Sequence, residues 1–426
     1  MSLGLPQGLN YASQKARASA RQRLISITPD SGTSFSMGQS VSFRLPTAQG
    51  QYIDTSTVQL QFSLTNNHGT KHLKCSSSGS CVIARKIERQ AQVISDIGPG
   101  YNQLVEILLD TQMGAQQRVS SNAITSGNDA THARLGLSHA AGATKVYRIG
   151  LYGGLLGGAS KYVPCNLSSS MVLELDLETA VRAFVWEAGT TGLTDESATL
   201  SNLELTYNTV ELPAEMDRML LASSPVQTVM IEDFQTTTTT MAAGATAHNT
   251  VLPFNKSSMK SYFAAMFLQS QSNTPTLSCI NNRARSQLTS FQVNIGGLMF
   301  PDKALTMVNN HALDHGAVFF TNALLAVGHI TPNEVHHTSM LLADWKTVTS
   351  TAAADPGSFF VGVDTDSFVG VSSGVYSGKN TLNTNFSPTY QFGAGAETGG
   401  LLFRHFCCFD SVVSIDSSTG LISVSN

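Results

Sequence analysis

Apolar and polar residues alternate in short stretches along most of the chain. The clearest case is residues 203–208, LELTYN, in which every second side chain is apolar. Residues 173–178, LELDLE, and residues 58–64, VQLQFSL, repeat the pattern. Because successive side chains of a strand point to opposite faces, this period of two predicts strands with one buried and one exposed face. The carboxylates Glu174 and Asp176 are then expected on the solvated face of an edge strand.

Two stretches have helical spacing instead. In residues 101–115, Leu104, Ile107 and Leu108 recur at the i, i+3, i+4 spacing of an amphipathic helix. A second helix is predicted from Asn309 to Val327. Strands are predicted before and after each helix, so the chain lacks the strict alternation of strand and helix that is typical of a parallel sheet.

The chain is duplicated about its middle. Strands, one helix and further strands occur in the same order in both halves, and the Thr-rich residues 236–244 are predicted to form a turn near the start of the second. The FRLP segment at 43–46 has a counterpart in VLPF at 251–254, and residues 56–64 have one in residues 258–268. These features predict an all-β protein of two consecutive eight-stranded antiparallel jelly rolls, each with one inserted helix. The predicted domains are a basic N-terminal arm (1–27), a first jelly roll (28–212), a linker (213–224) and a second jelly roll (225–426).

Composition adds a property of the surface. Charged residues make up only 13% of the 426 residues, against about 25% in ordinary soluble proteins. Such a surface is typical of a protein that buries much of its outside against copies of itself, although Gly-rich β enzymes share the bias. The net charge of −4 argues against a surface covered by nucleic acid.

The arm is basic. It contains Lys15, Arg17, Arg21 and Arg23, and no acidic residue precedes Asp30. Residues 11–24 contain neither Pro nor Gly, so they predict either a short basic helix that contacts an acidic partner or a terminus without regular structure. No apolar run has the length of a secretory signal or a membrane span, which predicts folding in a reducing cytosol or nucleus.

The motifs of common catalytic and metal sites are incomplete. His311 and His315 have the i, i+4 spacing of metal ligands, but the segment reads HALDH and lacks the Glu of the metalloprotease motif. Residues 374–380 have the wrong glycine spacing for a phosphate-binding loop. The sequence therefore predicts no catalytic residue, no metal site and no cofactor, and a protein that is not an enzyme.

The six cysteines form no CxxC pair, which argues against a zinc ribbon. Cys75 and Cys81 flank a Ser/Gly turn and could pair, whereas the adjacent Cys407 and Cys408 face opposite sides of a strand and cannot share a site. Free buried thiols are the expected state.

The duplicated plan resembles the double jelly-roll major capsid proteins of tailless icosahedral DNA viruses, the adenovirus/PRD1-like lineage that includes virophage- and polinton-like viruses. The likeness extends over most of the chain from residue 25 onward. The segments that carry it are LLGGASKYVPCNLSSSMVLELDLE (155–178), LELTYNTVELPAEM (203–216), FVGVDTDSF (360–368), SGKNTLN (377–383) and FRHFCCFDSVVSIDSSTGLISVS (403–425).

The resemblance implies a structural role. Such proteins form homotrimers whose six jelly rolls give a pseudo-hexagonal capsomer, and these capsomers tile an icosahedral shell. The implied partners are neighbouring capsomers and penton and minor capsid proteins, in a virion assembled in the host cytoplasm or nucleus. The arm with Lys15, Arg17, Arg21 and Arg23 would lie inside, in contact with neighbours, an internal membrane or the genome.

Two other functions remain open from the sequence. A two-domain jelly-roll protein for glycan binding or attachment would need clustered aromatic side chains, but Trp186 and Trp345 are isolated in the sequence. A two-barrel enzyme of the cupin type would need several His and a Glu on strands of one barrel, whereas the His pair lies on a predicted helix.

Overall fold

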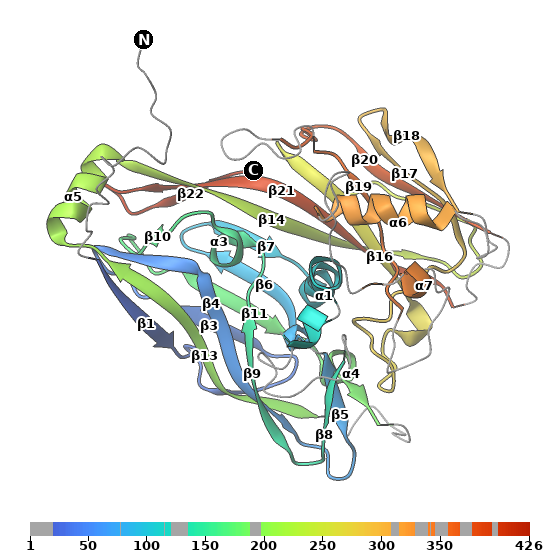
Figure 1. Ribbon diagram of the computed structural model, residues 1–426, viewed down its shortest axis with the longest axis horizontal. Coiled ribbons are helices and arrows are strands. Elements are labelled where there is room, and N and C mark those ends of the chain that lie inside the picture. The colour runs from blue at the N-terminus through green and yellow to red at the C-terminus, as the bar shows by residue number, and fades with distance from the viewer. Residues whose placement is uncertain are drawn as a thin grey trace, which may run out of the picture.

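The computed structural model describes residues 20–76, 78–114, 116–120, 135–187, 197–307, 315–328, 340, 342–345, 357–366, 377–393 and 399–426. Within these ranges the chain forms two β-rich halves that lie side by side along the long axis of the molecule (Figure 1). The paired strands are antiparallel throughout the described sheets.

The first half contains two main sheets. One has the order β1 (Arg21–Ile27), β13 (Ala198–Glu211), β4 (Gln51–Asn66) and β10 (Val163–Pro164), with β2 (Ser34–Ser36) on β13 and β9 (Thr144–Gly150) on β4. The other has the order β3 (Ser40–Arg44), β11 (Val172–Leu177), β6 (Ile83–Arg89) and β7 (Val93–Ile97). A small third sheet joins β12 (Val185–Trp186), β5 (Leu73–Ser76) and β8 (Leu135–His139).

The second half repeats the two main sheets. Its first sheet has the order β14 (Val226–Met241), β21 (Leu401–Asp416), β16 (Met259–Leu268) and β19 (Val361–Asp364), with β22 (Ile422–Ser425) on β21. Its second sheet has the order β15 (Ala247–Asn249), β20 (Phe386–Phe392), β17 (Leu288–Ile295) and β18 (Leu298–Thr306). The second sheets correspond strand for strand, and in the first sheets β1, β13 and β4 correspond to β14, β21 and β16, as expected for two jelly rolls.

The main helices also correspond. Helix α1 (Tyr101–Gln112) follows β7 in the first roll, and α6 (His315–Ala326) follows β18 in the second. The predicted architecture of two consecutive antiparallel jelly rolls with a helix in the same place is therefore confirmed. Shorter helices in the described residues include α3 (Gly154–Gly158), α4 (Ala180–Ala183) and α7 (Leu342–Trp345).

Two local predictions were wrong, and the predicted linker is helical. Threonines 236–240 continue β14 instead of turning, because every residue from Val226 to Met241 pairs with β21 and β-branched side chains suit a strand. The predicted linker contains helix α5 (Ala214–Ser223). Strand β11 is central, between β3 and β6, so Glu174 and Asp176 lie on its outer face and not on an edge strand.

Residues 21–24 differ from both expectations for this segment, a short helix and a terminus without regular structure. Residues 21–27 of the predicted arm form β1, which pairs along its whole length with β13. Pairing with the long central strand satisfies the backbone groups that a helix would otherwise satisfy internally. Residues 1–19 of the predicted arm lie outside the described residues, as do residues 309–314 of the second predicted helix.

Helix α6 packs on β19 through a close approach at Gly362. A Cβ atom built there would lie 2.5 Å from Cβ of Ala326 and 3.0 Å from the carbonyl oxygen of Tyr262. We expect Gly362→Ala to lower the free energy of unfolding by about 1–3 kcal/mol, because the helix and strand must move apart. Thermal or urea unfolding measures this, and Gly150→Ala is the control, since a Cβ there has no heavy atom within 4 Å. Equal stability of both variants would contradict the packing described.

Candidate assembly surfaces

Helix α1 joins the two rolls through buried charges. Eleven of its residues, Tyr101 to Thr111, are buried, including Glu106 and Asp110. Both carboxylates bind Arg118, with 2.5 Å between Nη2 of Arg118 and Oε2 of Glu106. Asp110 also binds Arg283, which comes from the second roll. Since these charged side chains have no solvent exposure, they depend on one another for compensation.

A second buried cluster lies where β6 and β7 approach β14. Lys86 Nζ is 2.6 Å from Oε1 of Glu88, and both side chains are fully buried. Glu88 also accepts hydrogen bonds from the backbone N–H groups of Leu155 and Leu156. From the second roll, Asp233 accepts a 2.8 Å hydrogen bond from Ser95. Burial raises the pKa of Asp233 to about 6, and the positive charge of Lys86 opposes the shift.

The C-terminal hairpin makes a third connection. The side chain of Gln90 donates to the carbonyl oxygen of Gly420 at 2.9 Å and accepts from the N–H of Ile422 at 2.9 Å. Gln92 donates to the carbonyl oxygen of Ile422 at 3.0 Å. With hydrogen bonds and ion pairs spread along the junction, the two rolls form one unit.

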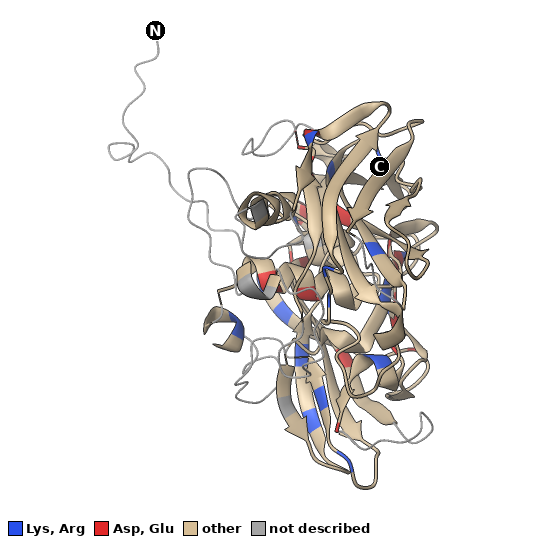
Figure 2. Ribbon diagram, turned by 90° about the vertical axis from the view of Figure 1, so that its right-hand side faces the viewer, with Lys and Arg blue, Asp and Glu red and all other residues tan. Residues whose placement is uncertain are grey.

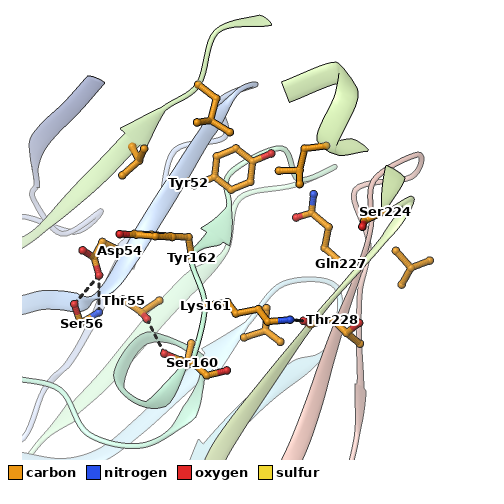
Figure 3. Close-up of a pocket in the computed structure, with 16 residues that line it drawn as sticks. Tyr52, Asp54, Thr55, Ser56, Ser160, Lys161, Tyr162, Ser224, Gln227 and Thr228 are labelled. Atoms are coloured by element: carbon orange, nitrogen blue, oxygen red, sulfur yellow. Dashed lines mark hydrogen bonds between the residues drawn. The ribbon is translucent and has the colours of Figure 1, made fainter. Parts of the chain in front are cut away.

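A cavity of about 800 Å³ lies near the linker helix, between β4, β13, α5 and the start of β14. Figure 3 shows Tyr52 and Tyr162 on one side of it and Gln227 and Thr228 on the other. The Tyr52 hydroxyl donates to Asp217 at 2.7 Å, and burial together with this carboxylate raises the pKa of Tyr52 to about 12. Its lining combines apolar side chains with polar ones and includes the charged side chains of Asp54 and Lys161.

The predicted arm residues are only partly placed. Arg21 and Arg23 lie on β1 at the edge of the first sheet, where Arg23 forms a 2.9 Å ion pair with Glu211. Lys15 and Arg17 lie outside the described residues. Most of the molecule shows few charged positions along its strands (Figure 2). The first described residue, Ala20, is exposed beside the end of β13.

Other candidate chemistry finds little support in the described part of the chain. His315 begins α6, while His311, His329, His336 and His337 lie outside that part. No group of three or more metal-binding side chains is present among the described residues. All six cysteines are free and buried, and the Sγ atoms of Cys75 and Cys81 are 3.2 Å apart. Among the helices of these residues, none combines the length and the apolar character that crossing a bilayer requires.

Both tryptophans belong to the core. Trp186 donates from Nε1 to the carbonyl oxygen of Ala180, and Trp345 donates to that of Phe360. Both side chains are almost fully buried. Neither ring is therefore available to stack on a sugar.

A buried polar network in the second roll escaped sequence analysis. His405 contacts the hydroxyl of Tyr262 at 2.6 Å and that of Thr239 at 2.7 Å. The Tyr262 hydroxyl also contacts that of Tyr390 at 2.6 Å. Burial lowers the pKa of His405 to about 3, so the imidazole is neutral at pH 7. The sequence signal for this network was the polar His405 within FRHFCCF, a stretch otherwise rich in residues typical of a buried strand.

Solved structures identify the fold. No protein-family model matches the sequence, and a search of curated proteins gave no match. The chain is similar in structure to a capsid model of the virus PBCV-1, with a TM-score of 0.64 and 12% identity over 96% of this chain and 98% of the other. It is also similar to a chain of the Sputnik virophage structure (TM-score 0.56, 12% identity, 100% and 93% coverage) and to the mavirus major capsid protein (0.51, 11%, 100% and 95%). The chain therefore has the fold of the double jelly-roll major capsid proteins.

Proposed function

We propose that this protein is the major capsid protein of an icosahedral virus and has a structural, non-catalytic role in the virion. The observation that carries the proposal is the pair of jelly rolls with matching strand orders, fixed side by side and shared over nearly the whole chain with viral capsid proteins. A shell needs building blocks of fixed shape. The buried junction holds the two rolls in one arrangement and so gives the chain such a shape.

The building block is a homotrimer. Three copies of a two-roll unit place six similar rolls in a closed ring, which gives a pseudo-hexameric capsomer that can tile a shell. A head-to-tail contact between copies gives a closed ring when the rotation from each copy to the next returns to the first copy. The low fraction of charged residues supports extensive contact with neighbours, because charge is depleted in the core of interfaces. Neighbouring capsomers, penton proteins and minor capsid proteins are the further partners, with assembly in the host cytoplasm or nucleus.

The N-terminal segment makes interior contacts in this proposal. Lys15 and Arg17, with Arg21 and Arg23 at its base, would attract an acidic partner such as a minor protein, an internal membrane or the genome. Because Arg23 already pairs with Glu211, the residues before β1 would contribute most of this attraction.

The alternative is a two-domain jelly-roll protein for glycan binding or attachment. Burial of both tryptophans disfavours it, since sugar recognition in such a protein would rely on exposed aromatic rings. Binding to a glycan array by a stable monomer would favour this alternative.

The solution mass tests the proposal. Light scattering with size-exclusion chromatography is expected to give three times the chain mass of 45.3 kDa. A monomer that persists at high protein concentration would contradict a capsid role.

Truncation tests the arm. Deleting residues 1–19 is expected to leave the trimer mass and the melting temperature unchanged, because β1 remains, while assembly into shells is reduced. Particle yield by sedimentation measures the effect. The control is the variant with Lys15 and Arg17 replaced by Gln, which keeps the length of the segment. If the truncated protein assembles into particles with the same yield as the full-length protein, the proposed role of the arm is contradicted.

A further inference from the structure

Two buried cysteines of the first roll have their thiols in contact. Cys75 lies in β5, and Cys81 lies in η2 (Ser80–Val82), the short 3-10 helix that follows it. The two Sγ atoms are 3.2 Å apart. A disulfide bond is about 2.0 Å long, so the sulfur atoms need to approach by only about 1.2 Å to form one. Both side chains are fully buried, and both are free thiols.

Helix α1 holds the turn between the two cysteines. The hydroxyl of Ser78 donates to the carboxylate of Glu106, and the carbonyl oxygen of Cys81 accepts from Nδ2 of Asn102 at 3.3 Å. Glu106 is itself fixed by the buried Arg118 at the junction of the rolls. Because these contacts do not involve the sulfur atoms, the fold alone brings the two thiols together.

Strand β9 holds the same turn from another side. Gly79 has a φ of 72°, and a Cβ atom there would lie 2.9 Å from Cδ1 of Tyr147 and 3.1 Å from Cγ2 of Ile149. Its N–H donates to the carbonyl oxygen of Ser76 at 3.0 Å, and the N–H of Ser76 contacts Sγ of Cys81 at 3.4 Å. The turn is therefore fixed from two sides, with the thiols already facing each other.

The remaining cysteines are placed differently. Cys407 and Cys408 are neighbours in β21, so their side chains point to opposite faces of the sheet. The thiol of Cys279 contacts two backbone carbonyl oxygens at 3.4 and 3.5 Å. Among the six cysteines, all of which the structure describes, Cys75 and Cys81 form the pair whose thiols touch.

We propose that Cys75 and Cys81 form a redox-sensitive pair, which closes to a disulfide bond when the folded chain meets an oxidising thiol–disulfide buffer such as glutathione. One cysteine thiolate attacks a sulfur atom of oxidised glutathione and releases one reduced glutathione. The other cysteine thiolate attacks the resulting mixed disulfide and releases the second reduced glutathione. The two cysteines lose two electrons and two protons, and the two glutathione molecules gain them.

The bond would lock the turn to the junction between the rolls. It closes a loop of seven residues, from Cys75 to Cys81, and so removes conformational freedom from the unfolded chain. Burial, and to a smaller extent the thiol of Cys81, raise the pKa of Cys75 well above its ordinary value. Because the thiolate is the reacting form, oxidation of the folded chain is expected to be slow.

The bond requires only the fold of the first roll, whereas its timing rests on the proposed function. A capsid protein is made in a reducing cytosol and leaves the cell inside a particle, where the surroundings are oxidising. Oxidation of the pair would then follow release and stabilise the released shell.

The test measures the redox equilibrium of the pair in the full-length protein. The protein is equilibrated with mixtures of reduced and oxidised glutathione, the remaining thiols are alkylated, and the chain is cut with trypsin. Cleavage after Lys74 and Arg85 releases both cysteines in one peptide, residues 75–85, which carries no alkyl group in its disulfide form. The ratio of oxidised glutathione to the square of reduced glutathione at half-oxidation should be about 10–100-fold lower for the folded protein than for the protein unfolded in urea.

Slow exchange is controlled by a second starting material. Each mixture is approached from fully reduced protein and from protein produced in a bacterial cytosol that oxidises thiols, where the pair can react during folding. The second material is expected to contain the disulfide before any glutathione is added. If both cysteines are alkylated in that material, or if folded and unfolded chains need the same glutathione ratio, the inference is overturned.

Melting temperatures provide an independent measurement. Oxidised protein is expected to melt about 2–4 °C above reduced protein. Cys81→Ser should lose this difference while keeping the fold, because the serine oxygen can still accept from the N–H of Ser76. Cys279→Ser is the matched control, since its hydroxyl can donate to the same backbone carbonyl oxygens, and it should keep the difference. A difference that persists in Cys81→Ser would overturn the inference. These measurements need only the folded chain, so the trimer mass that tests the capsid role is judged separately.

Discussion

Replacing Lys86 by Met is expected to destabilise the protein by about 3–5 kcal/mol, the usual range when one partner of a buried ion pair is removed. The substitution leaves the carboxylate of Glu88 without solvent and without its cation, 2.6 Å away in the unchanged protein. The Glu88 carboxylate then keeps its hydrogen bonds from the backbone N–H groups of Leu155 and Leu156. Urea unfolding followed by tryptophan fluorescence measures the loss.

A second substitution separates charge from packing. The double variant Lys86→Met with Glu88→Gln removes the unpaired charge, and the amide oxygen of Gln keeps one of the two backbone hydrogen bonds, which go to different oxygens of Glu88. We expect it to be more stable than Lys86→Met alone. The exposed pair Arg85–Asp96 is the control, and Arg85→Met should change stability by no more than about 1 kcal/mol. A double variant as unstable as the single one would contradict the electrostatic explanation.

Acidification from pH 7 to pH 4.5 is expected to cost about 2–3 kcal/mol of stability through His405 alone. The pKa of this imidazole is lowered from 6.5 to about 3 by burial, with a smaller effect from His248. Between these two values the unfolded chain binds a proton that the folded chain does not, so stability falls as the pH falls. Each pH unit within this window changes the free energy by about 1.4 kcal/mol.

Other buried groups also change the total loss of stability on acidification. His139, whose pKa burial also lowers to about 3, acts in the same direction as His405. Asp233 acts in the opposite direction, because its raised pKa of about 6 lets the folded chain hold a proton below pH 6 that the unfolded chain releases. The informative quantity is therefore a difference between variants rather than the total for one protein.

His405→Gln isolates the contribution of one group. Its own stability at pH 7 is reduced by the altered network with Tyr262 and Thr239. Between pH 7 and 4.5, however, it should lose about 2–3 kcal/mol less than the unchanged protein, since the titrating group is gone. Unfolding free energies at both pH values measure this. Identical pH dependence of the two proteins would mean that His405 does not remain neutral in the folded state.

The sequence predicted those strands whose two faces differ in environment. LELDLE at 173–178 forms most of β11, and LELTYN at 203–208 lies inside β13, because one face of each meets the core. The threonines from 236 to 240 were misjudged because they lack apolar alternation, and only their pairing with β21 makes them a strand. Likewise, β1 could not be recognised as a strand, since its burial pattern is mostly exposed and its partner lies far along the chain.

The junction between the rolls was beyond sequence reasoning for a similar reason. Asp110 and Arg283 are 173 positions apart, and nothing local indicates that they meet. A signal was present in α1, whose two charged residues, Glu106 and Asp110, stand at i, i+4 spacing beside its apolar side chains. Charges at buried positions of a helix call for partners from another element. The sequence gives no means of choosing which element that is.

Negative-stain electron microscopy of the purified full-length protein, with its mass measured in the same buffer, tests the capsid function most directly. We predict particles of three chains with a pseudo-hexagonal outline, which close into shells under assembly conditions. Compact particles of one chain, with neither outline nor shells at any concentration, would contradict the capsid function.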